Sequence, residues 1–329
     1  MKNIFALIAL VSVISQGHNV LAQIPQGGYG GALNSPDCIK AAEDKVDLPG
    51  DEMLVVNRKG EVCAYPLRMM TYHRIVNDHL GGLILVTYDP DTGIGRMFDR
   101  QIDGKEIFFD AAPGKKLSPR MKDRGTGSIW SPLTGEAISG SLKGKKLELV
   151  PSFVVTWGRW KEMHPDSYVL KLDDKSKSNY LPWSKYKGDN ITIRYTLEFP
   201  EIKPIQERMK LNWIVGANQF GKPFAFYLPT KKLITINIIS AIAFHDPAAH
   251  STVLYEPVVD GKPLTFKVDP AMPAAPFVDA ETNSHFALDG FAVDGPLKGK
   301  QLKWVDSLRM RGYAWQAAYP KVKIVYVSK

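Results

Sequence analysis

The sequence predicts a mainly β protein with a few short helices, made of two tandem, diverged copies of one β-rich module. Two observations predict this class. Short runs of apolar and β-branched residues are separated by turns that contain glycine and aspartate, which is the pattern of strands and hairpins. Several motifs also recur later in the chain at a nearly constant spacing, which is the mark of an internal repeat.

A secretory signal peptide is expected at residues 1–22. Lys2 gives a positive start, residues 4–14 are almost all apolar, and Ala22 closes a stretch of small or aliphatic residues. This apolar core of about 11 residues is too short to span a membrane, which takes about 20. No later stretch is long and apolar enough either, so a soluble periplasmic or secreted protein without a transmembrane segment is expected.

The composition is that of a globular protein, with 44% hydrophobic and 23% charged residues. The net charge is +8, but the basic residues are scattered among acidic ones. Nucleic-acid binding needs basic charge gathered on one surface, so no nucleic-acid partner is expected.

The repeat has three blocks in the same order. Residues 60–65 correspond to 221–226 at an offset of 161, and Asp103-Gly104 corresponds to Asp260-Gly261 at an offset of 157. The Leu-Lys-Gly-Lys stretches at 142–145 and 297–300, and the pair Trp160 and Trp315, share an offset of 155. The expected division is therefore a signal peptide (1–22), a first module (23–170), a connector (171–209) and a second module (210–329).

The local elements of the first module follow from turn signals and periodicity. Residues 53–56 and 62–65 flank a Lys-Gly turn and predict a hairpin, as do 83–88 and 96–98. Asp-Gly pairs in both modules predict type I′ turns. Helices are expected at 67–77 and 155–163, the second ending before Pro165. The connector contains Tyr180, Trp183 and Tyr186, so it is expected to pack across the modules, because free tethers have few aromatic residues.

Three long motifs connect this chain with a family. The stretches at 60–67 (GEVCAYPL), 73–82 (HRIVNDHLGG) and 157–166 (WGRWKEMHPD) resemble the bacterial family catalogued as domain of unknown function 3179. The resemblance covers nearly the whole mature chain and implies no established activity. It does imply a Cys-Pro-x-Cys motif after the central strand, downstream of a histidine, whereas this chain has Asp89 and Thr92 at the two cysteine positions. A soft metal site or redox thiol pair there would be lost.

A candidate pocket is expected around His73, whose counterpart in the second copy, at the offset of 161, is the apolar Ile234. Its other candidate residues, chosen from the histidine motif, the aspartate turn and the second helix, are Asn77, Asp78, Tyr88, Asp89, Asp91 and Trp157. The favoured function is a non-catalytic protein that binds an unknown small molecule or an envelope protein.

The alternative is a metal-binding protein or metal-dependent enzyme that uses His73, Asp89 and Asp91, whose oxygen atoms would favour calcium or magnesium. Each residue also has a structural explanation, because a buried histidine usually finds a backbone carbonyl and aspartate is common in turns.

Cys38 and Cys63 are the only two cysteines. In an oxidising compartment a disulfide between them is expected, with two separate buried thiols as the alternative. Neither lies in a Cys-x-x-Cys motif, which disfavours thiol-disulfide catalysis and a cysteine-based zinc site. No phosphate-binding glycine loop is present, so no nucleotide cofactor is expected.

Overall fold

The computed structural model describes residues 30–44, 50–115, 118–172, 175–180 and 212–328. Within these ranges the protein is mainly β, as the sequence predicts. The described helices are short: α1 (Leu67–His73), α2 (Trp157–Met163) and α5 (Gly312–Ala318), with the 3-10 helices η1 (Ala41–Glu43) and η2 (Lys177–Asn179). None of them is long and apolar enough to cross a bilayer. The expected signal peptide lies outside the described residues.

The first half of the chain forms three sheets and a small hairpin. Sheet I contains, in order, β15 (Phe153–Thr156), β3 (Glu52–Arg58), β4 (Glu61–Pro66), β16 (Tyr168–Leu170) and β2 (Cys38–Lys40). Sheet II contains β1 (Leu33–Asn34), β5 (Ile75–His79), β6 (Leu83–Asp89), β7 (Ile94–Asp99) and β14 (Leu149–Val150). Sheet III contains β10 (Phe109–Lys115), β11 (Ser118–Asp123), β12 (Ile129–Trp130) and β13 (Ala137–Ser139). The hairpin pairs β8 (Gln101–Ile102) with β9 (Lys105–Glu106).

The second half forms a matching set. Sheet I′ contains β28 (Ser307–Arg311), β17 (Trp213–Gln219), β18 (Lys222–Tyr227) and β29 (Ile324–Tyr326). Sheet II′ contains β19 (Ile234–Ile238), β20 (Ala241–Asp246), β21 (Ser251–Glu256) and β27 (Lys303–Trp304). Sheet III′ contains β24 (Phe266–Val268), β25 (Phe277–Asp279) and β26 (His285–Phe286), and the hairpin pairs β22 (Val258–Val259) with β23 (Lys262–Pro263).

The strand order of the two halves corresponds. Sheet I runs β15-β3-β4-β16 and then adds β2, while sheet I′ runs β28-β17-β18-β29. Sheet II contains the run β5-β6-β7-β14, and sheet II′ is β19-β20-β21-β27. This order is what two copies of one module would produce. That the halves are diverged copies stays a prediction, as do the boundaries of the modules.

The sheets stack as layers around apolar side chains. Leu54 of sheet I and Val86 of sheet II belong to one buried cluster. Phe98 on the opposite face of sheet II belongs to another, with Trp130 of sheet III. Alternate residues of a strand face opposite sides, so sheet II is buried on both faces between its two neighbours.

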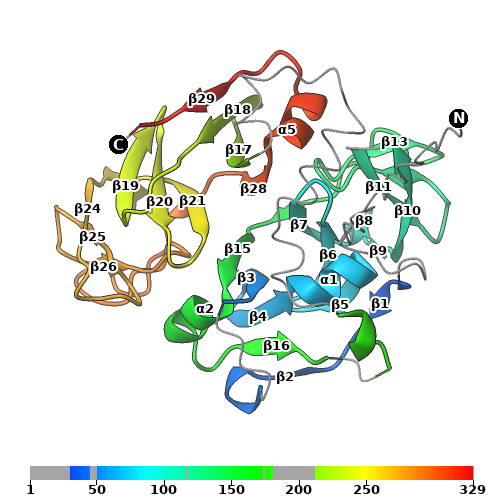
Figure 1. Cartoon of the computed structure of the whole chain (residues 1–329), viewed down its shortest axis with the longest axis horizontal. Helices are drawn as coiled ribbons and strands as arrows, with labels where there is room; N and C mark the ends of the chain where they lie inside the picture. Colours follow the sequence, from blue (N-terminus) through cyan, green and yellow to red (C-terminus); the bar gives the residue numbers. More distant parts are fainter. Residues whose placement is uncertain (1–29, 45–49, 116–117, 173–174, 181–211, 329) are drawn as a thin grey trace, which may run out of the picture.

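The two halves also share buried core. Trp160 of α2 lies in one apolar cluster with Phe244 and Tyr255 of the second half. Conversely, Ile94 of the first half packs in a cluster with Trp315 of α5. In Figure 1 the second half, yellow to red, lies to the left and top, and β15 of the first half reaches its edge. The halves are therefore packed against each other through their helices and strand ends.

Two backbone hydrogen bonds across this junction correspond to each other. The Thr156 N–H donates to the Ala249 carbonyl at 3.0 Å, and the Arg311 N–H donates to the Thr92 carbonyl at 2.9 Å. The offsets of the repeat relate these pairs, since 311 − 156 = 155 and 249 − 92 = 157. Each half therefore contacts the other with the same part of its structure, as in an interface with two-fold symmetry.

The expected hairpins are confirmed, and so are the Asp-Gly turns. Asp103 and Gly104 have φ of 50° and 74°, and Asp260 and Gly261 have 49° and 75°, as a type I′ turn requires.

The helix expected at 67–77 is wrong in its second half. It ends at His73, because Arg74 adopts φ 62° and its N–H caps the Met70 carbonyl. The β-branched Ile75 and Val76 then begin strand β5. The second helix begins at Trp157, two residues later than expected.

Candidate functional site

His73 is a buried residue at the end of α1, 4% exposed. Its Nδ1 atom lies 2.8 Å from the Gly31 carbonyl oxygen, and its Nε2 atom lies 2.6 Å from the Tyr180 hydroxyl. Both ring nitrogens therefore have protein partners. Tyr180 belongs to the expected connector and is buried in a cluster of first-half residues, whereas Trp183 and Tyr186 lie outside the described residues, so packing of the connector across both modules stays a prediction.

Asn77 and Asp78 lie on strand β5 and have structural partners. The Phe109 N–H donates to Asn77 Oδ1 at 2.9 Å, and Asn77 Nδ2 donates to the Phe109 carbonyl, also at 2.9 Å. Asp78 accepts a hydrogen bond of 2.8 Å from the Tyr65 hydroxyl, and burial raises its pKa. Asn77 joins sheet II to sheet III, so neither residue forms a pocket with His73.

The turn between β6 and β7 holds Asp89 and Thr92, the two positions at which the sequence resemblance leads us to expect cysteine. The Thr92 hydroxyl donates to Asp89 Oδ2 at 2.9 Å, and Arg74 donates to Asp89 Oδ1 at 2.9 Å. Asp91 lies 3.5 Å from Arg74 and is about one-third exposed. Burial, partly offset by the charge of Arg74, raises the pKa of Asp89 to about 6.

The second half holds this turn in place. The Tyr313 hydroxyl donates to the Asp91 carbonyl. The Trp213 ring lies so close to Gly93 that an added Cβ would come within 2.2 Å of it. The guanidinium groups of Arg309 and Arg311 lie 4.5 and 4.2 Å from the centre of that ring, which is cation–π distance.

The structure thus brings together only part of the predicted pocket. Tyr88, Asp89 and Asp91 lie at the junction, and burial raises the pKa of Tyr88. The proposed metal ligands do not form a metal site, because no three carboxylate, imidazole or thiol groups within the described ranges lie close enough together to bind one ion. Trp157 was predicted to line the pocket but is fully buried in the core shared by the halves.

The two cysteines are free thiols in this structure, not the expected disulfide. Their Sγ atoms lie 4.0 Å apart. Strand β16 lies between β2 and β4, which carry them, so their backbones are two strand spacings apart, about 9.5 Å. A disulfide needs Cα atoms within about 7 Å. The hydrogen bond with Cys38, together with burial, raises the pKa of Cys63 well above its usual value.

A shallow cleft of about 410 Å³ opens at the junction of the halves. The first half contributes most of its wall, and the second half closes it. It is lined by Arg96, Leu133, Thr134, Lys146, Leu147, Glu148, Leu149, Asn218, Asp306 and Tyr319. Pockets of this size between packed units are the usual place for a small ligand.

Arg96 is the most buried charged group of the cleft, 4% exposed. It lies on β7, on the same face as Ile94, which packs against the second half. Its guanidinium forms an ion pair with Asp306, yet its Nε atom has no hydrogen-bond partner among the described residues. The Oδ1 atom of Asn218 is likewise buried without one in the described part of the chain. Buried polar atoms are nearly always satisfied, and these two are the members of a larger set of unpaired buried atoms that belong to residues lining the cleft.

None of the residues predicted for the pocket lines this cleft. A signal for Arg96 was nevertheless present, because its counterpart at the offset of 157 is the apolar Val253. The same asymmetry singled out His73, whose ring serves the packing of the connector. Asn218, Asp306 and Tyr319 gave no local signal, since only the packing of the two halves brings them to Arg96.

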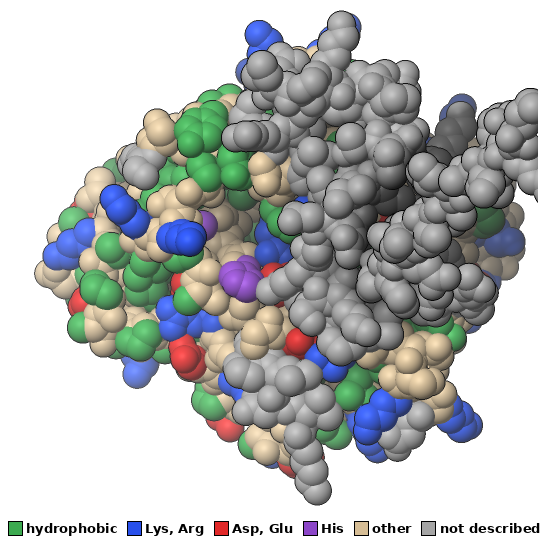
Figure 2. All heavy atoms as spheres, viewed as in Figure 1, with side chains coloured by type: hydrophobic (Ala, Val, Ile, Leu, Met, Phe, Trp, Pro, Cys, Tyr) green, Lys and Arg blue, Asp and Glu red, His purple; other side chains and the backbone are tan. Residues whose placement is uncertain are grey.

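Charged side chains on the described part of the face in Figure 2 are interspersed, with basic and acidic groups near one another. Where this face is formed by described residues, it shows no continuous basic track of the kind that binds a nucleic-acid backbone.

The protein is thus a mainly β protein, with two β-rich halves that pack against each other and a polar cleft at their junction. The chain belongs to the family described as "Protein of unknown function (DUF3179)", whose model matches residues 31–322. This family is the one that the sequence motifs indicated. No curated protein and no solved structure matches the chain.

Proposed function

We propose that this is an exported, non-catalytic binding protein whose ligand is a small polar molecule held in the cleft between the halves. The observation that carries the proposal is the cleft between the halves, whose lining brings the charged Arg96 and Asp306 and the amide of Asn218 together. A small ligand that offers both an acceptor and a donor would suit this polar lining. Amino acids and hydroxy acids have this chemistry. The layout of residues 1–22 supports export.

The absence of a catalytic role is supported by the turn at 89–92. In the family pattern the two side chains there would be thiols, and here they are a carboxylate and a hydroxyl bonded to each other. Asp89 is further held by Arg74. Neither group is a redox centre or a soft metal ligand, so this member would keep the binding architecture without sulfur chemistry.

The test is a screen of the purified mature protein against amino acids, hydroxy acids and small sugars by thermal shift, with hits confirmed by calorimetry. A true ligand at roughly 100 times its Kd stabilises the fold by about 2.7 kcal/mol. Arg96→Met and Asn218→Ala are expected to abolish the shift. Arg124→Met, which removes an exposed arginine paired with Asp110, is the matched control. If no class binds, or if Arg96→Met binds as well as the parent, the proposal fails.

The metal-dependent alternative has less support, because both ring nitrogens of His73 are engaged and both aspartates share Arg74. Metal analysis of the mature protein and of His73→Ala tests it. Stoichiometric calcium or magnesium that disappears in the variant would favour this alternative over the proposal.

A further inference from the structure

The two halves differ at one edge of their corresponding sheets. In sheet I the strand β16 pairs with β4 on one side and with β2, antiparallel, on the other. Its counterpart β29 in sheet I′ pairs only with β18 within the described residues. The first half therefore carries an added strand at the position where the second half, as far as its described residues go, ends in an edge strand.

The backbone of β29 is oriented to accept such a strand. The Val327 N–H donates to the Tyr227 carbonyl of β18. Because successive residues of a strand direct their N–H and C=O groups to opposite sides, those of Ile324 and Tyr326 point away from β18. An open row of such groups is a template for pairing with another chain.

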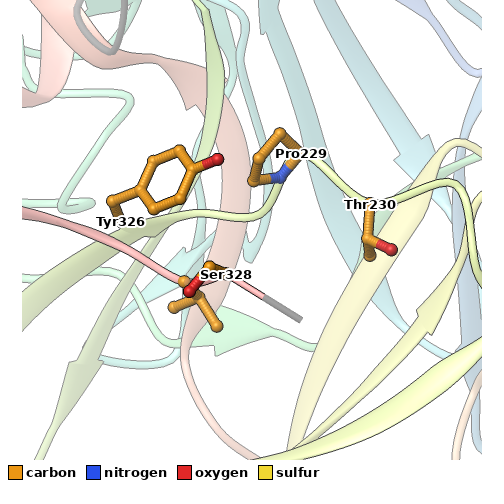
Figure 3. Close-up of a pocket in the computed structure, with 5 residues that line it drawn as sticks. Pro229, Thr230, Tyr326 and Ser328 are labelled. Carbon is orange, nitrogen blue, oxygen red and sulfur yellow. The ribbon is translucent and has the colours of Figure 1, made fainter.

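Apolar side chains lie exposed along the same edge. Val325 is 58% exposed and Tyr326 is 56% exposed. Tyr326 also lines a shallow pocket with Pro229, Thr230 and Ser328, shown in Figure 3. This pocket lies at the end of β29, between that strand and the residues that follow β18.

The charge around the edge has one sign. Residues 212–245 and 307–328 contain no aspartate or glutamate. Five exposed lysines lie on β18, beside the pocket and just before β29: Lys222, Lys231, Lys232, Lys321 and Lys323. None of these five forms an ion pair with a described residue. The described stretches around β29 are therefore basic and supply no acidic side chain of their own.

We propose that β29 binds an extended acidic segment of a partner protein, which adds to sheet I′ as an antiparallel strand in the way that β2 adds to sheet I. Main-chain hydrogen bonds to Ile324 and Tyr326 would supply the pairing, and the lysines would select acidic residues. A second copy of this chain fits less well, since pairing two β29 strands would bring Lys321 and Lys323 of both copies to one edge. This site is separate from the cleft and does not depend on it.

The probe is a fluorescein-labelled, blocked hexapeptide that alternates glutamate with valine, and its comparison peptide alternates lysine with valine. Binding is followed by fluorescence anisotropy at low and high salt. The acidic peptide is expected to bind saturably and at least about tenfold more tightly than the basic one, and to weaken as salt screens the lysines. Lys321→Glu/Lys323→Glu is expected to reverse this preference.

Two variants at one position test the pairing mode. Tyr326→Pro removes the outward N–H, which an edge strand tolerates, whereas Tyr326→Ala keeps it. Loss of binding in the proline variant but not in the alanine variant supports strand addition, provided that both variants keep the parent's melting temperature. Equal loss in both, equal binding of the basic peptide, or no saturable binding overturns the proposal. A concentration-dependent dimer that Tyr326→Pro abolishes would instead identify a second copy as the occupant.

Discussion

The hydroxyl of Thr92 donates a 2.9 Å hydrogen bond to the carboxylate of Asp89 across the turn that joins β6 to β7. These are the two positions at which the resemblance to the family leads us to expect cysteine. The fold thus holds the two side chains in contact even though neither contains sulfur. Two cysteines at these positions would start from side chains that already lie in contact across the turn.

Restoring both cysteines is therefore expected to restore an oxidisable pair. In a background without the natural cysteines (Cys38→Ser/Cys63→Ser), Asp89→Cys/Thr92→Cys should form an intramolecular disulfide in air, because the side chains already meet. Thiol titration under denaturing conditions and intact mass measure it. Asp91→Cys/Thr92→Cys is the control, since adjacent cysteines rarely bond. Two persistent free thiols in the 89/92 variant would contradict the prediction.

The free energy of unfolding is expected to depend on pH because Asp89 gains or loses a proton. Burial raises the pKa of this carboxyl from 3.8 to about 6 in the folded state, so the folded state binds the proton more tightly than the unfolded chain. Unfolding between pH 4 and about 6 then releases a proton, and stability falls as pH rises through this window. The loss amounts to about 3 kcal/mol from this group by pH 7.

Asp89→Asn removes the titration, so the variant is expected to gain stability relative to the parent as pH rises from 4 to 7. Urea unfolding at several pH values measures the difference. Asp91→Asn serves as the control, because it shares Arg74 but is more exposed. A difference between parent and Asp89→Asn that is constant with pH would show that Asp89 does not titrate in this range.

The strands were predictable where the signal is local. The hairpin of β3 and β4 follows from alternation around a glycine turn, and the Asp103-Gly104 turn follows from the backbone conformation that glycine permits. The region after His73 was not predictable, because a short helix followed by a strand has no periodicity of its own. The left-handed conformation of Arg74 separates this helix from the strand.

The candidate site was predictable only in part, for a related reason. Asp89 belongs to a recognisable motif, but Arg96 meets Asn218 and Asp306 only after two halves far apart in the sequence pack together. Long-range packing of this kind leaves no spacing pattern in a single chain. Comparing the two halves position by position is the sequence analysis that points to such a residue, as it does for Arg96.

The two natural cysteines are expected to remain reduced even after passage through an oxidising compartment. Strand β16 separates their strands, and the raised pKa of Cys63 leaves little reactive thiolate at neutral pH. Thiol titration of the protein after expression in an oxidising periplasm should find two thiols in denaturant and fewer in the folded state, where Cys63 is buried. No free thiol in denaturant would show that the disulfide expected from the sequence forms, with β2 displaced from its place beside β16.

Asn77 is expected to be the costliest of the predicted pocket residues to replace, and for a structural reason. Its side chain is fully buried and pairs with both the N–H and the C=O of Phe109, which tie sheet II to sheet III. Asn77→Ala would leave both backbone groups buried and unsatisfied, at about 1 to 3 kcal/mol each.

Urea unfolding should therefore place Asn77→Ala about 2 to 5 kcal/mol below the parent. Asn34→Ala is the matched control, because Asn34 is exposed and accepts a single hydrogen bond from Asn77; it should cost less than about 1 kcal/mol. Ligand binding in the cleft should survive in any Asn77→Ala protein that remains folded. A stable Asn77→Ala protein that loses binding would place Asn77 in a functional site, as its motif first indicated, and not in the packing of the sheets.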